Sequence, residues 1–176
     1  MRTSEKLDTL IAEDGLQARI RELGAQIARD YAGHDLVLVG VLKGSFLFMA
    51  DLCRAVDLPL SVDFIGLSSY ANATETSGVV RITSDLTRPI EGKDVLVVED
   101  IIDTGLTMKY LLENLATRHP RSVKVCALLH KPARQRTPTE IHYLGFTIPD
   151  AFVVGYGLDF GEKYRNVPFV GVMKGA

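Results

Sequence analysis

The sequence predicts an α/β fold with a mainly parallel, twisted sheet flanked by helices. Unbroken apolar runs at 36–42 (LVLVGVL), 95–98 (VLVV) and 123–129 (VKVCALL) are typical of parallel strands covered on both faces. Helical patterns lie between these runs, so strands and helices alternate along the chain. Such units are joined by right-handed crossovers, which generate a parallel sheet.

The first part of the chain contains two helical patterns around one buried strand. A short apolar segment occupies 7–11, and apolar residues then recur at helical spacing between 16 and 31. Asp14 and Gln17 predict a capping pair at the start of this helix. After the first apolar run, residues 46–56 predict a second helix.

The rest of the chain predicts more strands and one further helix. Apolar residues alternate at 60–64, and the polar stretch SSYANATETSG at 68–78 predicts a mobile loop or a hairpin tip. Residues 79–83 predict its return strand, and 107–118 predict a helix. Shorter apolar segments predict small strands at 143–146, 152–154 and 169–173.

Domain organisation follows from the absence of repeats and linkers in the sequence. Residues 1–176 are expected to form one domain with a core at roughly 34–140. A small hood subdomain is expected from the two ends of the chain, at 1–15 and 141–176.

Composition and charge exclude several classes of protein. Hydrophobic residues make up 47% and charged residues 24% of the chain, as in soluble globular proteins. The net charge of −2 argues against non-specific binding to nucleic acid or anionic lipid. No apolar run approaches the roughly 20 residues that span a bilayer, and the opening MRTSEKLDTL has no apolar signal core. We therefore expect a cytoplasmic protein with no membrane partner.

The cysteines and histidines predict no structural zinc and no disulfide. Cys53 lies in a helical pattern and Cys126 in a strand pattern, so both are expected in the core. The four histidines are scattered without the spacing of metal ligands.

The segment VLVVEDIIDTGLT at 95–107 carries the strongest functional signal. Its apolar strand delivers Glu99, Asp100 and Asp103 to the carboxyl edge of the sheet, where ligands of parallel sheets collect. Carboxylates this close together are costly unless they meet solvent, a cation or hydroxyl donors.

Polarity changes directly after these carboxylates. Thr104, Gly105 and Thr107 offer hydroxyls and a flexible backbone where a helix begins, and N–H groups at a helix start bind phosphate. A phosphorylated sugar has the same division between hydroxyls and phosphate. An isolated Asp-Thr-Gly would instead indicate a solvated turn with Thr107 as a helix cap. The strand, the acidic pair and the final Thr together favour the ligand.

The segment Val-Val-Glu-Asp-Ile-Ile-Asp-Thr-Gly-Leu-Thr resembles the phosphoribosyl pyrophosphate signature of the type I phosphoribosyltransferases, most closely their hypoxanthine-guanine branch. Further family blocks follow in order: LVGVLKGSFLF, SSY, LLHKPAR and FVVGYGLDFGEKYRNVPFVGV. The resemblance implies the fold of this family, with Mg²⁺ as its cofactor.

The resemblance also implies a role for each residue of the signature. Glu99 and Asp100 would bind the ribose hydroxyls and help to place Mg²⁺. Asp103 would act as general base near purine N7, and 103–107 would hold the 5′-phosphate. Some relatives carry Lys where this chain has Leu106, so Leu106 would contribute only its backbone N–H.

Lys43 and Gly44 follow the first buried strand. Glycine permits a close backbone approach and lysine adds positive charge, but the spacing is not that of a Walker loop. By themselves they indicate an ordinary strand-to-helix turn. The resemblance implies a pyrophosphate loop with a cis peptide between Leu42 and Lys43.

The resemblance assigns the purine to Lys131, Phe152 and Val153. A lysine after a strand is usually a solvated rim residue, but here Lys131 would donate to the 6-oxo group. Because an ammonium can only donate, it favours hypoxanthine or guanine over adenine. By pattern Phe152 and Val153 belong to the core; by resemblance Phe152 stacks on the base and the Val153 backbone binds its edge.

Three further assignments rest on the resemblance. Asp159 would be a second metal-binding carboxylate, and Arg165 would bind pyrophosphate. Ser69 and Tyr70 would belong to a lid that closes over the site, although their segment fits a disordered hairpin tip equally well by composition.

The implied function is purine salvage. The enzyme would transfer the 5-phosphoribosyl group from phosphoribosyl pyrophosphate to hypoxanthine or guanine, giving IMP or GMP and pyrophosphate. Relatives form dimers and tetramers, so a homo-oligomer is expected. One alternative is a nucleotide-sensing regulator of the same fold that binds nucleic acid, which the net charge disfavours. A phospho-acceptor receiver domain is a second alternative, which would need an acidic pair after its first strand. Here that region reads Ile-Ala-Glu-Asp-Gly before a helix, with no following acceptor strand, so this alternative is disfavoured.

Overall fold

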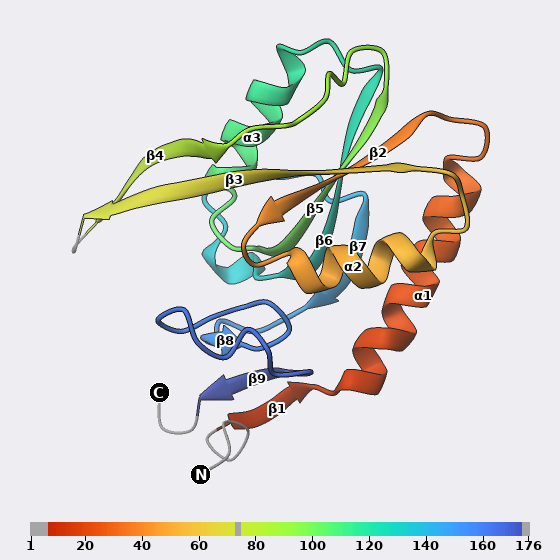
Figure 1. Ribbon diagram of the computed structural model, residues 1–176. Coiled ribbons are helices and arrows are strands. Elements are labelled where there is room, and N and C mark those ends of the chain that lie inside the picture. Colours follow the sequence, from red (N-terminus) through yellow and green to blue (C-terminus); the bar gives the residue numbers. More distant parts are fainter. Residues whose placement is uncertain (1–6, 73–74, 174–176) are drawn as a thin grey trace.

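The computed structural model describes residues 7–72 and 75–173, without the side chains of residues 69–79. Within this part, the strands form two sheets (Figure 1). The larger sheet has six strands in the order β4-β3-β2-β5-β6-β7, and the smaller has three in the order β1-β9-β8. The predicted α/β class is confirmed.

The larger sheet is parallel except at one edge. Its parallel strands are β2 (Leu36–Leu42), β3 (Ser61–Asn72), β5 (Asp94–Ile102), β6 (Ser122–His130) and β7 (Tyr143–Thr147). The edge strand β4 (Glu75–Ser84) pairs antiparallel with β3. These two strands extend away from the rest of the molecule in Figure 1, so the polar stretch predicted as a loop or hairpin tip belongs to a long hairpin.

Helices cover both faces of the larger sheet. One face carries α1 (Glu13–Asp30) and α2 (Phe46–Ala55), and the other carries α3 (Leu106–Ala116) (Figure 1). Successive residues of β5 enter opposite cores: Leu96 packs with α1 and α2, whereas Val95 and Val97 pack with α3. All three side chains are fully buried. This two-sided burial explains the unbroken apolar run.

The smaller sheet joins the two ends of the described chain. Strands β1 (Leu7–Ile11) and β8 (Val153–Val154) each pair antiparallel with β9 (Val170–Met173). This sheet forms the hood, below α2 in Figure 1. Residues 143–147 were expected in the hood, but they pair in parallel with β6 and form the edge of the larger sheet as β7.

The structure differs from two local expectations. Helix α1 follows Ala12 without a side-chain cap, so the Asp14–Gln17 capping pair is wrong. Gln17 Nε2 instead donates to Asp51 Oδ2 on α2, at 2.8 Å. Strand β5 continues beyond its apolar part to Ile102, so the first carboxylates of the signature lie in a strand and not in a loop.

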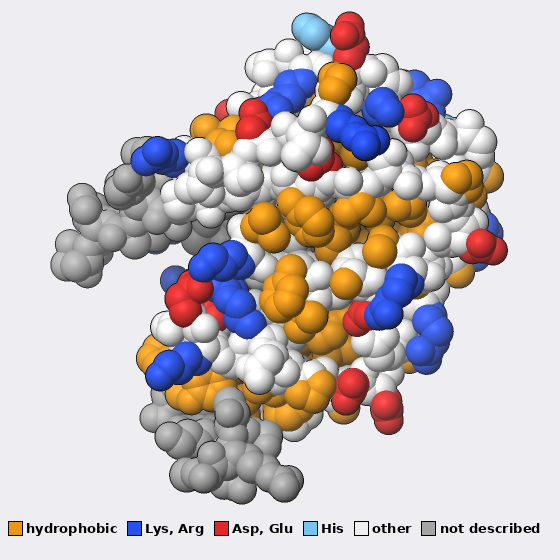
Figure 2. All heavy atoms as spheres, viewed as in Figure 1, with side chains coloured by type: hydrophobic (Ala, Val, Ile, Leu, Met, Phe, Trp, Pro, Cys, Tyr) orange, Lys and Arg blue, Asp and Glu red, His pale blue; other side chains and the backbone are white. Residues whose placement is uncertain are grey.

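Apolar side chains also reach the surface over α2 and β3. Phe46 and Val62 are 39% and 45% exposed, and Figure 2 shows a band of hydrophobic side chains across this face. A contiguous band of this kind is typical of a contact surface for another protein. Among the described residues, no helix has both the length and the apolar character needed to cross a membrane.

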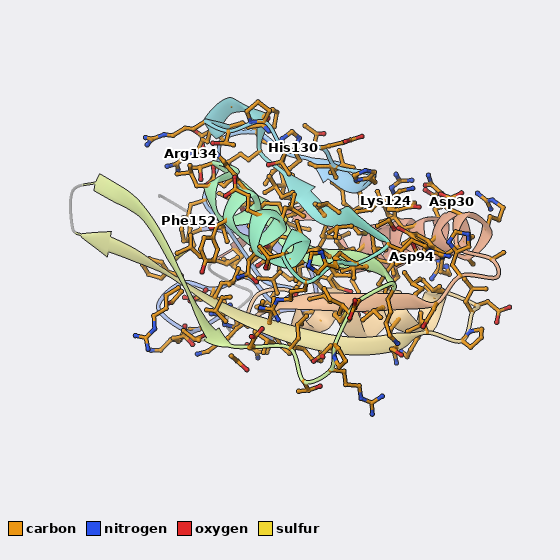
Figure 3. All side chains as sticks on the ribbon, turned by 90° about the horizontal axis from the view of Figure 1, so that it is seen from above. Asp30, Asp94, Lys124, His130, Arg134 and Phe152 are labelled. Carbon is orange, nitrogen blue, oxygen red and sulfur yellow. The ribbon has the colours of Figure 1, made fainter. Side chains whose placement is uncertain are left out.

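Asp94 joins the amino ends of the parallel strands. Its carboxylate, which is 3% exposed, accepts hydrogen bonds from Arg121 and from Ser122 Oγ (2.5 Å), and lies 2.9 Å from His34 Nδ1. The hydrogen bond from Arg121 lowers the pKa of Asp94 most strongly, and those from Ser122 and His34 lower it further. Burial acts in the opposite direction, and the net pKa is about 2. Figure 3 shows Asp94 at the end of the molecule opposite Phe152.

Asp94→Asn is expected to destabilise the protein at neutral pH. The folded-state pKa lies below the ordinary value of about 4, so ionised Asp94 stabilises the fold above about pH 4. This contribution is lost as the pH falls towards 2. It should amount to less than about 2 kcal/mol, because solvent screens the half-exposed Arg121.

Urea unfolding of wild type and variant at pH 7 and pH 2.5 measures this effect. The difference between the two proteins should be largest at pH 7 and should shrink at pH 2.5. Asp35→Asn is the control, because Asp35 forms an exposed ion pair with Lys93. Equal destabilisation by Asp94→Asn at both pH values would contradict the prediction.

Candidate active site

The site lies where connections leave the larger sheet in opposite directions. From β2 the chain passes to β3 on one side, whereas β5 is followed by β6 and β7 on the other side. Ligands of open parallel sheets bind beyond the carboxyl ends of the strands at such a switch point. Here the loop after β2 and the end of β5 lie at this point.

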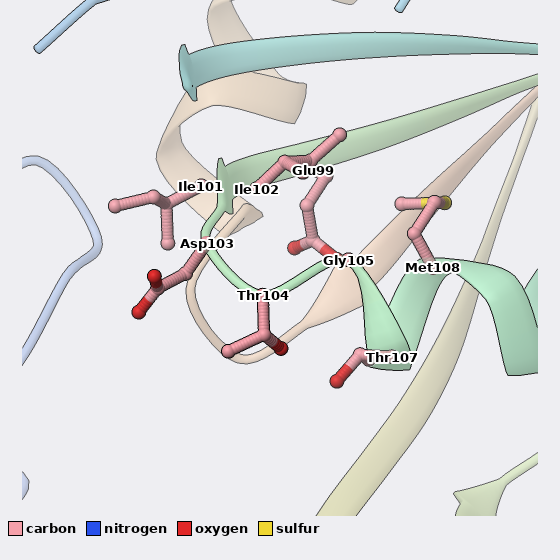
Figure 4. A pocket seen from close by; sticks show the side chains of 8 residues that line it. All are labelled: Glu99, Ile101, Ile102, Asp103, Thr104, Gly105, Thr107 and Met108. Carbon is pink, nitrogen blue, oxygen red and sulfur yellow. The ribbon is translucent and has the colours of Figure 1, made fainter. Parts of the chain in front are cut away.

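Two adjoining hollows occupy this edge of the sheet. The first, of about 220 Å³, is lined by Gly44 and Asp100 among others. The second, of about 80 Å³, is lined by the residues shown in Figure 4. The hollows share Glu99, Ile101 and Thr107. The last part of β5 and the start of α3 therefore border both hollows, with acidic side chains on the strand and a hydroxyl on the helix.

Glu99 and Asp100 form an acidic pair near the end of β5, with Glu99 buried and Asp100 partly buried. Glu99 is 6% exposed, and its Oε1 accepts a hydrogen bond from the Asp100 N–H at 3.2 Å. Burial, followed by the neighbouring charge of Asp100, raises the pKa of Glu99 well above its ordinary value. Burial also raises the pKa of Asp100. Both carboxylates are therefore poised to gain from a cation or a hydroxyl donor.

The start of α3 can bind an anion. The helix follows Gly105, which has a φ of +82° and provides no side-chain cap. No acidic residue lies in the first turn, and Leu106 N–H makes only a long contact of 3.4 Å with Thr104 Oγ1. Backbone N–H groups therefore remain for a phosphate, beside the hydroxyls of Thr104 and Thr107 (Figure 4).

Asp103 points away from Glu99 (Figure 4). Its Oδ1 is buried and has no hydrogen-bond partner among the described residues. Arg134 Nε lies 3.5 Å from this oxygen, on the 3₁₀ turn Pro132–Arg134 that follows β6. A carboxylate oxygen without a donor can accept a proton from a bound ligand.

The loop after β2 has the close approach expected of Lys43 and Gly44. The peptide between Leu42 and Lys43 is cis. A Cβ on Gly44 would lie 1.7 Å from Asp100 Oδ2, so only glycine lets this loop approach the acidic pair. Lys43 Nζ donates a hydrogen bond to Glu162 Oε2 at 2.7 Å.

Two of the three predicted purine-binding residues are buried. Lys131 is 5% exposed and follows β6, and its N–H donates to the Ile102 carbonyl at 3.0 Å. Val153 is 6% exposed and begins β8. Phe152 is 52% exposed, and its ring meets Phe160 edge to face, with centroids 5.7 Å apart. A half-exposed ring of this kind is available for stacking.

Asp159 and Arg165 form an ion pair in the hood, with Asp159 Oδ1 2.9 Å from Arg165 Nη2. Glu162 Oε1 also lies 3.1 Å from Arg165 Nη2, which links this pair to Lys43. No group of three or more acidic, histidine or cysteine side chains in the described part of the chain is placed to hold a metal ion. The geometry thus does not bring Asp159 together with Glu99 and Asp100, and its metal role stays a prediction.

Two predicted lid residues cannot be placed at the site, and three residues near the site were not predicted. The side chains of Ser69 and Tyr70 lie outside the described residues, so their lid role also stays a prediction. Sequence reasoning assigned no role to Arg134, Glu162 or Phe160. The only sequence signal for them is that each lies within a block that matches the family, LLHKPAR or FVVGYGLDFGEKYRNVPFVGV.

Comparison with known proteins identifies this arrangement. The model of the phosphoribosyl transferase domain family matches residues 8–161. The chain belongs to this family. A hypoxanthine-guanine phosphoribosyltransferase from Mycobacterium avium is 50% identical, over 93% of this chain and 84% of that protein. The enzyme of the same name from Bacillus subtilis is 47% identical to this phosphoribosyltransferase. The match covers 95% of this chain and 93% of the Bacillus subtilis protein.

A solved structure is similar over the same extent. The crystal structure of a hypoxanthine phosphoribosyltransferase from Staphylococcus aureus matches this phosphoribosyltransferase with a TM-score of 0.93 and 48% identity. The match covers 97% of this chain and 93% of that one. The fold predicted from the sequence resemblance is therefore confirmed, including the hood.

Glu99→Gln is expected to stabilise this phosphoribosyltransferase in the absence of ligands. A carboxyl whose pKa is raised by folding destabilises the folded state when it is ionised. The variant should therefore melt above wild type at pH 8, by roughly 2–4 °C for about 1 kcal/mol. The difference should vanish near pH 4, where Glu99 is protonated in both states.

Differential scanning calorimetry at both pH values measures this shift. Glu113→Gln is the control, because Glu113 is an exposed residue paired only loosely with Lys109. A Glu99→Gln variant that melts below wild type at pH 8 would show that the carboxylate stabilises the ligand-free fold.

Proposed function

We propose that this phosphoribosyltransferase joins hypoxanthine or guanine to phosphoribosyl pyrophosphate, giving IMP or GMP and pyrophosphate in purine salvage. The observation that carries the proposal is the loop after β5 at the switch point. This loop joins the acidic pair, which lies near the end of β5, to an uncapped helix start. The combination matches the hydroxyls and the 5′-phosphate of a phosphorylated ribose. The relatives named as hypoxanthine-guanine phosphoribosyltransferases support the choice of substrate.

Mg²⁺ is the proposed cofactor, held by Glu99 and Asp100. Two adjacent carboxylates with raised pKa values, one buried and one partly buried, fit a divalent cation, which would offset their repulsion. Mg²⁺ prefers one or two carboxylates together with water and substrate phosphates, so it needs no larger protein cluster. When bound, it neutralises charge on the pyrophosphate. Asp159 is a further candidate ligand.

Asp103 is the proposed general base. As purine N9 bonds to ribose C1′, the bond from C1′ to pyrophosphate breaks, and the purine must lose its N7 proton. The buried Asp103 Oδ1 has no hydrogen-bond partner among the described residues and can accept that proton. Arg134 Nε, 3.5 Å away, places a positive charge beside this carboxylate.

The base and the pyrophosphate are bound by residues on both sides of the site. Lys131 donates to the 6-oxo group, Phe152 stacks on the purine, and the Val153 backbone binds its edge. The half-exposed Phe152 ring supports the stacking role. Lys43, Gly44 and Arg165 bind pyrophosphate, and Ser69 and Tyr70 close over the site.

The 5′-phosphate is assigned to residues 103–107, with Leu106 contributing its N–H. The long contact from this N–H to Thr104 Oγ1 leaves it available for a better acceptor. The hydroxyls of Thr104 and Thr107 complete the set.

The cellular setting is proposed on chemical grounds. Phosphoribosyl pyrophosphate is too highly charged to cross an apolar bilayer unaided, and the cytoplasm is the proposed compartment in which the enzyme meets it. The apolar band over α2 and β3 supports a homo-oligomer, as a dimer or tetramer. A nucleic-acid-binding regulator is not favoured, since the relatives reported above are named as enzymes.

Asp103→Asn is expected to lower kcat by about 10²–10⁴-fold, because an amide cannot accept the N7 proton. Binding of phosphoribosyl pyrophosphate should remain within a few-fold of wild type, since the acidic pair and the start of α3 are unchanged. Steady-state kinetics and calorimetry measure the two effects. A variant that turns over at the wild-type rate would remove Asp103 from the mechanism.

The substrate is tested by pyrophosphate release with Mg²⁺, phosphoribosyl pyrophosphate and each of hypoxanthine, guanine, xanthine and adenine. Hypoxanthine or guanine should react and adenine should not. Lys131→Gln should reduce kcat/KM for hypoxanthine by about 10–100-fold, because it replaces a charged donor to the 6-oxo group. The control is Lys124→Gln, at the opposite end of the molecule (Figure 3). Activity with adenine alone would overturn the assignment.

A further inference from the structure

Asp51 is a mostly buried carboxylate with three donors. It lies on α2, the helix that begins directly after the pyrophosphate loop. Its Oδ2 accepts hydrogen bonds from Gln17 Nε2 at 2.8 Å and from the Tyr156 hydroxyl, and Arg54 pairs with its Oδ1. Burial opposes ionisation, but the bonds from Tyr156, Gln17 and Arg54 together lower the pKa of Asp51. The carboxylate is therefore charged and engaged on both oxygens.

Two of these donors come from segments that adjoin the hood strands. Gln17 lies on α1, which follows the hood strand β1 with only Ala12 between them. Tyr156 lies directly beyond the hood strand β8 and is 4% exposed. One carboxylate of the core thus holds the segments next to both hood strands.

The turn that carries Tyr156 touches the pyrophosphate loop. Gly155, Tyr156 and Gly157 all have positive φ angles, of 94°, 49° and 100°. A bulky residue adopts this conformation only where its surroundings hold it. A Cβ on Gly157 would lie 2.0 Å from the Gly44 carbonyl oxygen, so the two backbones are in contact. The Gly157 carbonyl also accepts from Arg165 Nη1 at 2.7 Å.

We propose that Asp51 and Tyr156 are positioning residues that fix the hood against the pyrophosphate loop and so hold the two halves of the site in register. This role rests on the proposed function, because it concerns how that site is assembled. The core half, on β5 and α3, binds the ribose and its 5′-phosphate. The hood half, near β8, binds the purine and orients Arg165.

Two ligands that contact different halves of the site should respond differently to a shift of the hood. Ribose 5-phosphate reaches only the core half, so its affinity should not depend on the hood. IMP also reaches the purine residues of the hood, so its affinity should fall when the hood is free to shift.

Tyr156→Phe is the main test, because it removes one hydroxyl and keeps the buried ring. The Kd of IMP with Mg²⁺, measured by calorimetry, should rise about tenfold, the effect of losing one hydrogen bond to a charged group. The Kd of ribose 5-phosphate should stay within twofold of wild type. Asp51→Asn should act in the same direction, and Tyr156→Phe carries the test if that variant does not fold.

Tyr143→Phe is the matched control. The Tyr143 hydroxyl donates to Asp30 Oδ2 at 2.8 Å, and its side chain is 3% exposed. This bond joins β7 to α1 outside the hood. The control should lower the melting temperature about as much as Tyr156→Phe, while leaving the Kd of IMP unchanged.

Three results would overturn the inference: unchanged IMP binding in Tyr156→Phe, equal weakening of both ligands, or equal weakening of IMP binding by Tyr143→Phe. Wild-type protein that binds ribose 5-phosphate but not IMP would overturn the proposed function itself, and this inference with it.

Discussion

Two adjacent carboxylates, Glu99 and Asp100, end a strand whose other side chains are almost all in the core. Their burial raises both pKa values and makes them repel each other, so the surrounding structure must tolerate them without a ligand. Gly44 approaches so closely that any side chain there would displace Asp100. The loop after β2, the switch point and the α3 start are therefore arranged around one unfavourable charge pair. Such a site exchanges stability for binding.

Much of this arrangement could be predicted from the sequence, because burial on both faces leaves an unbroken apolar run. Strand β2 was predicted with its observed bounds, and the acidic signature was placed at the correct edge. The purine side depended on family resemblance, since Phe152 has no pattern that separates a stacking ring from a core ring. Bonds between distant segments, such as Gln17 to Asp51 and Arg134 to Asp103, left no local signal. For the same reason β7 was assigned to the wrong sheet.

The site is divided between a rigid half and an attached half. The ribose-phosphate side belongs to β5 and α3, which are packed into both cores of the larger sheet. Two of the proposed purine-binding residues, Phe152 and Val153, belong to the hood. Buried apolar side chains of the hood, such as Val153 and Val170, pack into the core beside α1 and α2, and polar contacts such as Tyr156 to Asp51 add to this packing. A division of this kind lets one sugar-phosphate platform serve different bases, since changes in the hood leave the platform intact.

The position of β9 between β1 and β8 affects the order in which parts of the protein fold during synthesis. Leu7 pairs with Met173, so the first described strand meets its partner only after the chain has been made as far as Met173. The larger sheet is complete once Thr147 has left the ribosome. A nascent chain can therefore hold a finished ribose-phosphate platform while its β1 is still unpaired. Closing so long a loop is slow, which makes the purine pocket the last part of the enzyme to form.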